Sequence, residues 1–143
     1  MENDASQHSS LEKIILIYRF YIKCVLETGL EFITGLYAAN TNQAFNFLER
    51  DPKNEMVLDR VREYLIEGKA SGEIRSDVDI NMALLRIGVI ITGMIYYWCI
   101  FGGRIDLASQ TDLMLQDYLI TLAANKNASF ELEPISPLEG SLI

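Results

Sequence analysis

Side chains that could perform catalysis are few and scattered in this sequence. The single histidine, His8, lies in a polar and acidic N-terminal stretch, and the two cysteines, Cys24 and Cys99, lie in separate apolar runs without a neighbouring histidine. No G-x-S-x-G, Walker A or HExxH motif occurs, and no carboxylate pair lies on an apolar helix face. The cysteine spacing indicates neither a zinc site nor a disulfide framework. We therefore expect no enzyme, no metal and no cofactor, with the cysteines as free thiols in a reducing cytosol.

Two further polar features have simple structural interpretations. Asp112 is interpreted as a helix cap and Asp117 as part of a solvated helix face. Gly102 and Gly103 precede Arg104, which could suggest a phosphate site, but these glycines end a predicted helix. The dipole at a helix C-terminus repels anions, so a phosphate site is not expected there.

Aromatic side chains are the better candidates for a binding function. Aromatic walls with few polar groups are typical of small-molecule pockets, although the same side chains also fill ordinary cores. From composition alone, core packing is the favoured interpretation. The aromatic set comprises Tyr18, Phe20, Tyr21, Phe32, Tyr37, Tyr64, Tyr97 and Trp98.

The composition is that of one folded domain with an acidic surface. Half of the 143 residues are hydrophobic and 22% are charged, so the chain can bury a core without a disulfide or metal. The net charge of −8 opposes binding to nucleic acid or an anionic membrane surface. The N-terminus lacks the basic and then apolar pattern of a signal peptide. We expect a cytoplasmic chain that makes no contact with nucleic acid as written.

Hydrophobic spacing predicts helices throughout, with no strand alternation or repeat. Ser9 to Glu12 forms a predicted capping box that starts a helix, in which charged residues occupy one stripe from Glu12 to Glu27. Thr28-Gly29 bends or interrupts that helix. We then predict a helix over 30–39 and a loop or short helix over 43–50. A half-exposed helix follows over 53–71, with Gly72 as its C-terminal cap. Asp79 is the predicted N-cap of the next helix, which spans about 80–101.

The helix over 80–101 is nearly uncharged, and from Ile87 to Gly103 no residue carries a charge. A membrane span is one interpretation, but 17 residues only reach the lower limit for crossing a bilayer, and the neighbouring helices are amphipathic. We favour a soluble helix covered on both sides. The helical wheel places Leu84, Ile91, Met94, Ile95 and Trp98 toward the core, and Met82, Val89, Gly93, Tyr97 and Ile100 toward a partner.

The remaining chain predicts one more helix and a tail. A second capping box at Ser109 to Asp112 precedes a helix over 113–125, and the tail from Lys126 has no helical pattern. The predicted organisation is a flexible lead over 1–8, a helical domain over 9–125 and an irregular tail over 126–143.

Several of these segments together resemble the C-terminal domain of TetR/AcrR-family transcriptional regulators. The most specific is the junction from Glu67 to Asp77, Glu-Gly-x-x-x-Gly-Glu-Ile-Arg-x-Asp, followed by a long apolar helix with Thr92-Gly93 at its middle. Ser10-Leu11-Glu12-Lys13 and Gly29-Leu30-Glu31-Phe32 add to the similarity, which covers about 9–125.

The resemblance implies an all-α bundle of about five to six helices that dimerises through a four-helix bundle formed by the last two helices of each subunit. It also implies a pocket for a hydrophobic small-molecule effector. The expected pocket residues are Tyr18, Tyr21, Cys24, Phe32, Tyr37, Tyr64, Met94 and Trp98. The expected dimer interface comprises Val89, Gly93, Tyr97, Ile100, Leu115, Tyr118 and Leu122.

The expected function is therefore ligand binding and homodimerisation within a TetR-like regulator that acts as a repressor. No basic three-helix segment precedes Ser9, so we expect a detached regulatory domain, with DNA contacted only through a missing N-terminal domain. The first helix, Leu11 to Glu27, is expected to transmit ligand binding to the arrangement of the DNA-reading domains. The alternative is a stand-alone, homodimeric protein-interaction module without a small-molecule ligand.

Overall fold

The chain forms an all-α bundle in the computed structural model, which describes residues 7–39 and 52–141. The predicted loop or short helix over 43–50, and most of the predicted lead over 1–8, lie outside these residues. Across the described part, Ile74 and Ala123 form a single antiparallel bridge and no longer strand pairing occurs. The helices are α2 (Ser10–Thr28), α3 (Leu30–Ala39), α5 (Pro52–Ser71), α6 (Ile80–Ile100) and α7 (Leu107–Ile120).

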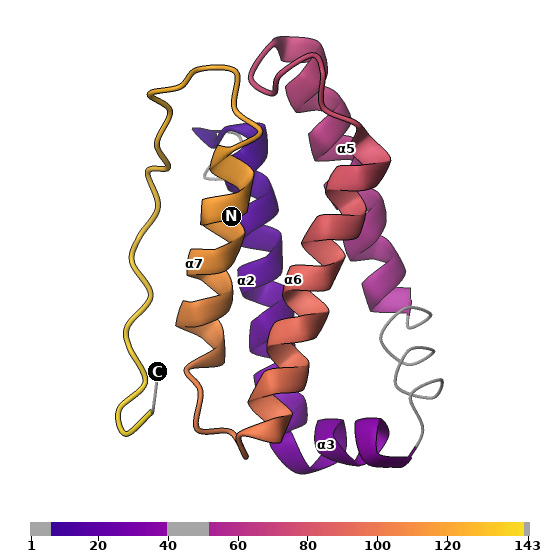
Figure 1. The fold of residues 1–143 in the computed structure, drawn as a ribbon, viewed down its shortest axis with the longest axis vertical. Helices are drawn as coiled ribbons and strands as arrows, with labels where there is room; N and C mark the ends of the chain where they lie inside the picture. The colour runs from indigo at the N-terminus through magenta and orange to yellow at the C-terminus, as the bar shows by residue number, and fades with distance from the viewer. Residues whose placement is uncertain (1–6, 40–51, 142–143) are drawn as a thin grey trace.

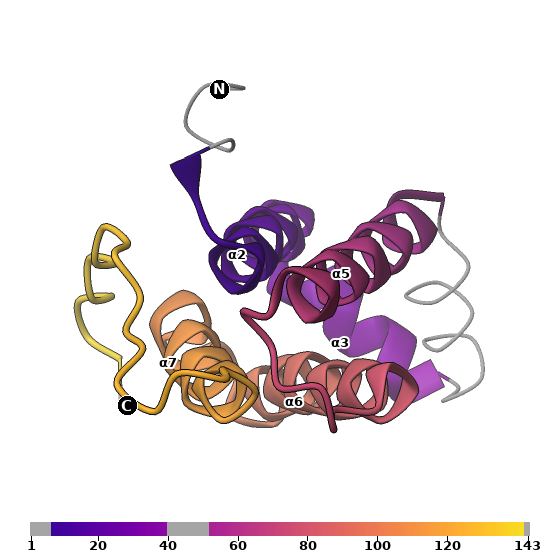
Figure 2. The same ribbon diagram turned by 90° about the horizontal axis from the view of Figure 1, so that it is seen from above.

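The four longer helices form two layers. Helices α2 and α5 lie in one layer and α6 and α7 in the other, as the view along the bundle in Figure 2 shows. Helix α3 crosses one end of the bundle, where it packs against α6 and α2 (Figure 1). The arrangement buries one side of every long helix, and large apolar side chains remain exposed on the other side of α6 and on α7.

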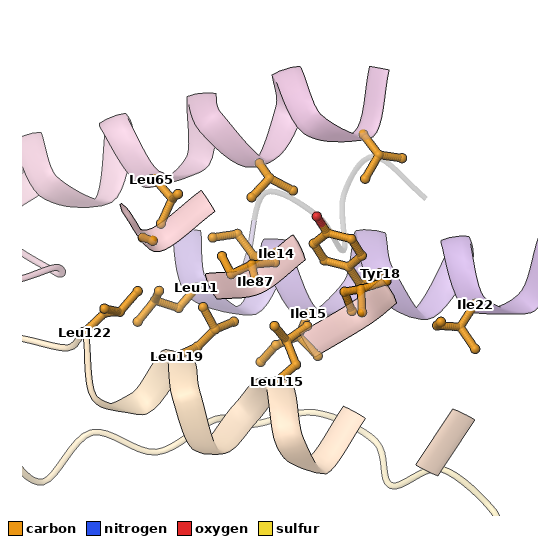
Figure 3. Close-up of a cluster of buried hydrophobic side chains, with 14 of the residues drawn as sticks. Leu11, Ile14, Ile15, Tyr18, Ile22, Leu65, Ile87, Leu115, Leu119 and Leu122 are labelled. Carbon is orange, nitrogen blue, oxygen red and sulfur yellow. The ribbon is translucent and has the colours of Figure 1, made fainter. Parts of the chain in front are cut away.

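The core lies between the two layers and is almost entirely aliphatic. Helix α2 contributes residues at three- and four-residue spacing, including Leu11, Ile14 and Ile22, and these side chains meet α5, α6 and α7 (Figure 3). Leu65 of α5 and Ile87 of α6 lie beside these α2 side chains and are fully buried. Because α2 contacts helices from both layers, it is the central helix of the fold.

The predicted start of α2 is confirmed. The Ser9 hydroxyl accepts a hydrogen bond from the Glu12 backbone N–H at 3.2 Å, and the Glu12 carboxylate accepts one from the Ser9 N–H at 3.1 Å. The polar stripe predicted on this helix is not uniformly solvated, because Glu12 is buried and Arg19 is engaged in an ion pair. Helix α2 ends at Thr28, and Gly29 adopts a positive φ of 103°, which turns the chain into α3.

The junction between α5 and α6 folds back against the start of α2. Gly72 has a φ of +87°, as a glycine cap requires, and Ile74 is 1% exposed beneath it. Gly68 lies so close to Ile74 and Ser10 that an added Cβ would come within 2.7 Å of the Ile74 side chain and 3.2 Å of the Ser10 Cβ. Asp79 then caps α6 by accepting from the Met82 N–H at 3.2 Å, as predicted.

The predicted start and end of the last helix are wrong. Helix α7 begins at Leu107, and its cap is Asp106, whose carboxylate accepts from the Ser109 N–H at 3.2 Å. Ser109 therefore lies within the first turn and does not form a capping box. The helix ends at Ile120, and Thr121 is its C-cap.

The segment after α7 contains no helix or strand as far as Ser141, and it runs back along the α7 side of the bundle (Figure 1). Three hydrogen bonds attach it: the Glu131 N–H donates to Glu12 at 2.7 Å, Arg19 donates to the Glu133 carbonyl at 2.8 Å, and the Leu138 N–H donates to Asp106 at 2.7 Å. The tail is thus held against the helices at three places.

Candidate ligand-binding and dimerisation surfaces

The most conspicuous surface of this molecule is apolar. Large hydrophobic side chains on α6, including Leu85, Val89 and Ile100, are more than half exposed, and Leu113 and Met114 extend the surface across α7. Helices α6 and α7 lie side by side in one layer of the bundle (Figure 2), and these exposed residues all come from that layer. We name this the α6–α7 outer face, and its members are Met82, Leu85, Val89, Tyr96, Tyr97, Ile100, Leu113 and Met114.

Four expected interface residues belong to or border this face. Val89, Tyr97 and Ile100 are 64%, 55% and 56% exposed. Gly93 is half-buried, and a Cβ added there would meet nothing within 4 Å, so the backbone of α6 is open to close approach at this point. Tyr118 on α7 is half-buried against the core cluster.

Leu115 and Leu122 do not belong to the interface expected from the sequence. They are 1% and 4% exposed, and both side chains point into the core between α2 and α7 (Figure 3). The physical reason is that α7 turns this side toward α2, so Leu113 and Met114 are the residues left facing outward. The expectation for these two leucines is therefore corrected.

Tyr18 belongs to the core. It is 4% exposed, and its ring makes an edge contact with Tyr21 at a centroid distance of 6.2 Å. Beside Tyr18 lies a cavity of about 30 Å³ between α2, α7 and the tail, which also contacts Arg19 and Asp112. This volume is about that of one water molecule, so no organic ligand fits there.

A charge pair beside this cavity joins α2 to α7. Arg19 donates to both carboxylate oxygens of Asp112, at 2.7 and 3.0 Å, and Gln116 donates a third hydrogen bond to the same carboxylate at 2.7 Å. The Asp112 side chain is 8% exposed. The interpretation of Asp112 as a helix cap is therefore wrong, because its role is to hold two helices together.

Trp98 lines a larger groove of about 750 Å³, which falls within the size range of small-molecule sites. The groove lies where the end of α2, the start of α3, the end of α6, the loop into the start of α7, and the tail meet. Its wall is mainly apolar, and two carboxylates, Asp106 and Glu139, are its charged groups. The remaining lining residues are Leu26, Leu30, Gly102, Gly103, Ile105, Leu107, Ala108, Ser136, Pro137 and Leu138.

Tyr37 belongs to a second cluster, between α3 and α6. Its ring contacts that of Tyr96 at a centroid distance of 5.3 Å. Burial, together with the nearby Cys99 and Tyr96, raises the pKa of Tyr37 to about 12. Burial also raises the pKa of the Cys99 thiol, and the nearby Thr34 hydroxyl partly offsets that rise. The phenol and thiol are therefore both protonated at neutral pH.

The other expected pocket residues are dispersed over the fold. Phe32 is 51% exposed, Cys24 and Met94 are half-buried, and the Tyr64 ring lies 5.7 Å from the Lys13 ammonium. Neither of the two cavities described above brings the expected set together: Trp98 lines the groove, Tyr18 lines the small cavity, and Tyr37 lines neither.

Sequence reasoning missed several residues of these surfaces. Leu85 and Tyr96 are exposed residues of the α6–α7 outer face, and their wheel positions close to Val89 could have identified them. Thr34 belongs to the α3–α6 cluster, and its position one turn before Tyr37 could have indicated this. No sequence signal identifies the groove, since its wall comes from segments that lie far apart in the sequence.

The described residues contain no group of three or more His, Cys, Asp or Glu side chains that could hold a metal ion. Helix α6 is long and apolar enough to cross a membrane by length and composition alone, with a mean hydropathy of 1.7, and a buried core helix passes the same test. Comparisons with family models, curated proteins and solved structures found no match to this chain.

Proposed function

We propose that this chain is the ligand-binding and dimerisation domain of a TetR-like transcriptional regulator, which senses a hydrophobic small molecule and acts as a repressor. In this proposal two copies pair through α6 and α7, and contact with DNA is made by a helix-turn-helix domain rather than by this sequence. The proposed location is the cytoplasm.

The observation that supports this proposal best is the α6–α7 outer face. Monomeric soluble proteins rarely expose so many large apolar side chains on one contiguous surface. Two adjacent helices that expose such a face can pair with a second copy about a two-fold axis, which gives a four-helix bundle. Gly93 supports close helix approach at this surface.

The same face argues against a membrane span. A helix that crosses a bilayer alone exposes apolar residues around its whole circumference. In contrast, α6 buries Ile87, Ile91 and Ile95 against its own chain and exposes the opposite side only. We therefore favour a second protein surface, rather than lipid, as the partner that covers the exposed side of α6.

The groove beside Trp98 supports the ligand-binding part of the proposal. Its size suits a drug-sized ligand, and its wall of aliphatic residues and one indole suits a hydrophobic one. A second candidate function, a homodimeric interaction module without ligand, is favoured by the dispersal of the expected pocket residues, most of which pack into the core or face solvent.

Dimerisation is tested by placing a charge on the outer face. We expect the chain to sediment as a dimer in analytical ultracentrifugation and Val89→Glu to sediment as a folded monomer, because a buried carboxylate at an interface is strongly unfavourable. Ile66→Glu is the matched control, since Ile66 is an exposed aliphatic residue on α5, away from this face. A wild-type monomer, or an undisturbed Val89→Glu dimer, would contradict the proposal.

Thermal unfolding in the presence of a panel of hydrophobic compounds separates the two candidate functions. A ligand that binds only the folded state raises the Tm as its concentration exceeds Kd. The ligand-binding domain predicts such a rise for at least one compound. Absence of any rise across a broad panel at saturating concentration would favour the interaction module.

A further inference from the structure

The groove beside Trp98 carries negative charge on an otherwise apolar wall. Among the described residues that line it, Asp106 and Glu139 are the charged ones, and all others except Ser136 are apolar. Arg104, the basic residue closest in sequence to Asp106, does not line the groove, and its Nε donates to a backbone carbonyl of the preceding turn at 3.1 Å. The groove therefore combines a large apolar surface with two carboxylates.

The two carboxylates belong to neighbouring parts of the wall. Asp106 accepts the Leu138 N–H at 2.7 Å, and Glu139 follows Leu138 directly in the chain. Asp106 is 6% exposed and is fixed in place, because its other oxygen accepts the Ser109 N–H at 3.2 Å as the cap of α7. Glu139 is exposed, so its side chain is free to adjust to a ligand. One carboxylate is thus rigid and the other adaptable.

This combination selects for a cation with a large apolar body. A carboxylate beside apolar surface attracts a positive group more strongly than it does in bulk water, and it repels an anion. The net charge of −8 adds a long-range attraction for cations. An organic anion would meet both carboxylates, and none of the described lining residues is a cation that could offset them.

We propose that this groove binds a hydrophobic organic cation, whose apolar body lies along the aliphatic wall and whose positive group lies beside Asp106 and Glu139. The inference rests on the proposed ligand-binding function and narrows its ligand from hydrophobic compounds in general to hydrophobic cations. The tail takes part in this site, because residues 136–139 form part of the wall.

The test uses two probes of the same shape and opposite charge, tetraphenylphosphonium and tetraphenylborate. Trp98 is the only tryptophan in the sequence and lines the groove, so its fluorescence reports binding at this place. Titrations at about 0.15 M salt screen distant surface charges, since the Debye length is then about 8 Å. We expect tetraphenylphosphonium to bind about tenfold more tightly than tetraphenylborate.

A first pair of variants tests whether the carboxylates of the groove cause this preference. Glu139→Gln removes a lining carboxylate, whereas Glu133→Gln removes an exposed carboxylate of the same tail that does not line the groove. We expect Glu139→Gln to weaken tetraphenylphosphonium binding about threefold, which is the effect of one exposed charge pair, and Glu133→Gln to leave it unchanged.

A second pair adds a positive charge instead. Ser136→Lys places an ammonium in the wall of the groove, and Ser129→Lys places the same charge on the tail outside it. Both serines are exposed, so neither substitution removes a packed side chain. Ser136→Lys should weaken tetraphenylphosphonium binding about tenfold and strengthen tetraphenylborate binding, whereas Ser129→Lys should change neither.

The possible failures separate this inference from the proposed function. If tetraphenylborate binds as tightly as tetraphenylphosphonium or more tightly, or if Glu139→Gln and Ser136→Lys respond no more than their controls, the inference is overturned while a ligand-binding domain is retained. If neither probe changes the fluorescence of wild type, the inference is also overturned, and the broad compound panel then decides whether any ligand-binding function remains.

Discussion

The carboxylate of Glu73 caps the helix that begins at Ser10. One oxygen of Glu73 accepts the Ser10 N–H and the other accepts the Leu11 N–H, each at 3.0 Å. These N–H groups would otherwise lack partners in the first turn of α2. The junction between α5 and α6 is therefore attached to the first turn of the central helix.

Glu73→Ala should lower the free energy of unfolding by about 1–2 kcal/mol, because it removes a charge-assisted cap from two N–H groups at once. Urea unfolding followed by circular dichroism measures the effect. Glu67→Ala is the control, since Glu67 is an exposed residue close to the same junction. Equal stability of the two variants would show that Glu73 does not hold α2.

Asp112→Ala should be more costly, at about 2–4 kcal/mol, because Arg19 would lose its carboxylate partner in a largely buried position and keep only the Glu133 carbonyl. Gln116 would also lose an acceptor. The control is Asp117→Ala, which removes an exposed carboxylate from the same helix. A loss no larger than that of the control in urea unfolding would mean that the pair adds nothing to stability.

Glu12 should contribute a pH-dependent part of the stability. Desolvation raises its pKa, but hydrogen bonds from the Glu131 and Ser9 N–H groups and from His8 outweigh this, so its pKa lies below 4.5. A carboxyl whose pKa falls on folding stabilises the protein above its ordinary pKa and loses that contribution as the pH falls through the lowered value. The stability difference between wild type and Glu12→Gln should therefore shrink from about pH 6 to about pH 3 in urea unfolding. A constant difference would contradict this assignment.

Gly93→Leu should weaken dimerisation at least tenfold without unfolding the subunit. A side chain added at Gly93 meets none of its own chain within 4 Å, so any effect on association must come from the partner surface. Gly35→Leu on α3 is the control, because that position is also open. Sedimentation equilibrium gives the dissociation constants, and circular dichroism checks that both variants are helical. If Gly93→Leu associates as tightly as wild type, the dimer interface does not include this part of α6.

Local sequence signals predicted much of this fold. Ser9 and Asp79 were identified as caps because such contacts involve residues only three positions apart. The left-handed cap at Gly72 and the two faces of α6 also follow from local sequence and helical spacing, and the exposures of Val89 and Ile91 agree with them.

The features that the sequence did not predict depend on contacts between residues that lie far apart in the chain. Asp112 resembles the last residue of a capping box, yet Arg19, 93 positions away, binds it. Leu115 shares a hydrophobic stripe with residues of α7, but spacing alone does not say whether that stripe meets α2 or a second copy. The groove beside Trp98 requires the tail to return along the bundle, which no local pattern indicates.

The hydrogen bonds that hold the tail use its backbone, and the partly buried side chains of Phe130 and Leu132 pack against the core as well. The groups that bind the helices are the Glu131 N–H, the Glu133 carbonyl and the Leu138 N–H. Substitutions at exposed positions of this segment should therefore preserve its route, whereas proline at 131 or 138 would remove a donor. The two prolines present, Pro134 and Pro137, lie at positions whose nitrogen is not used. The path of the tail can thus persist while its exposed positions change, provided that positions 130 and 132 stay apolar and that proline does not occur at 131 or 138.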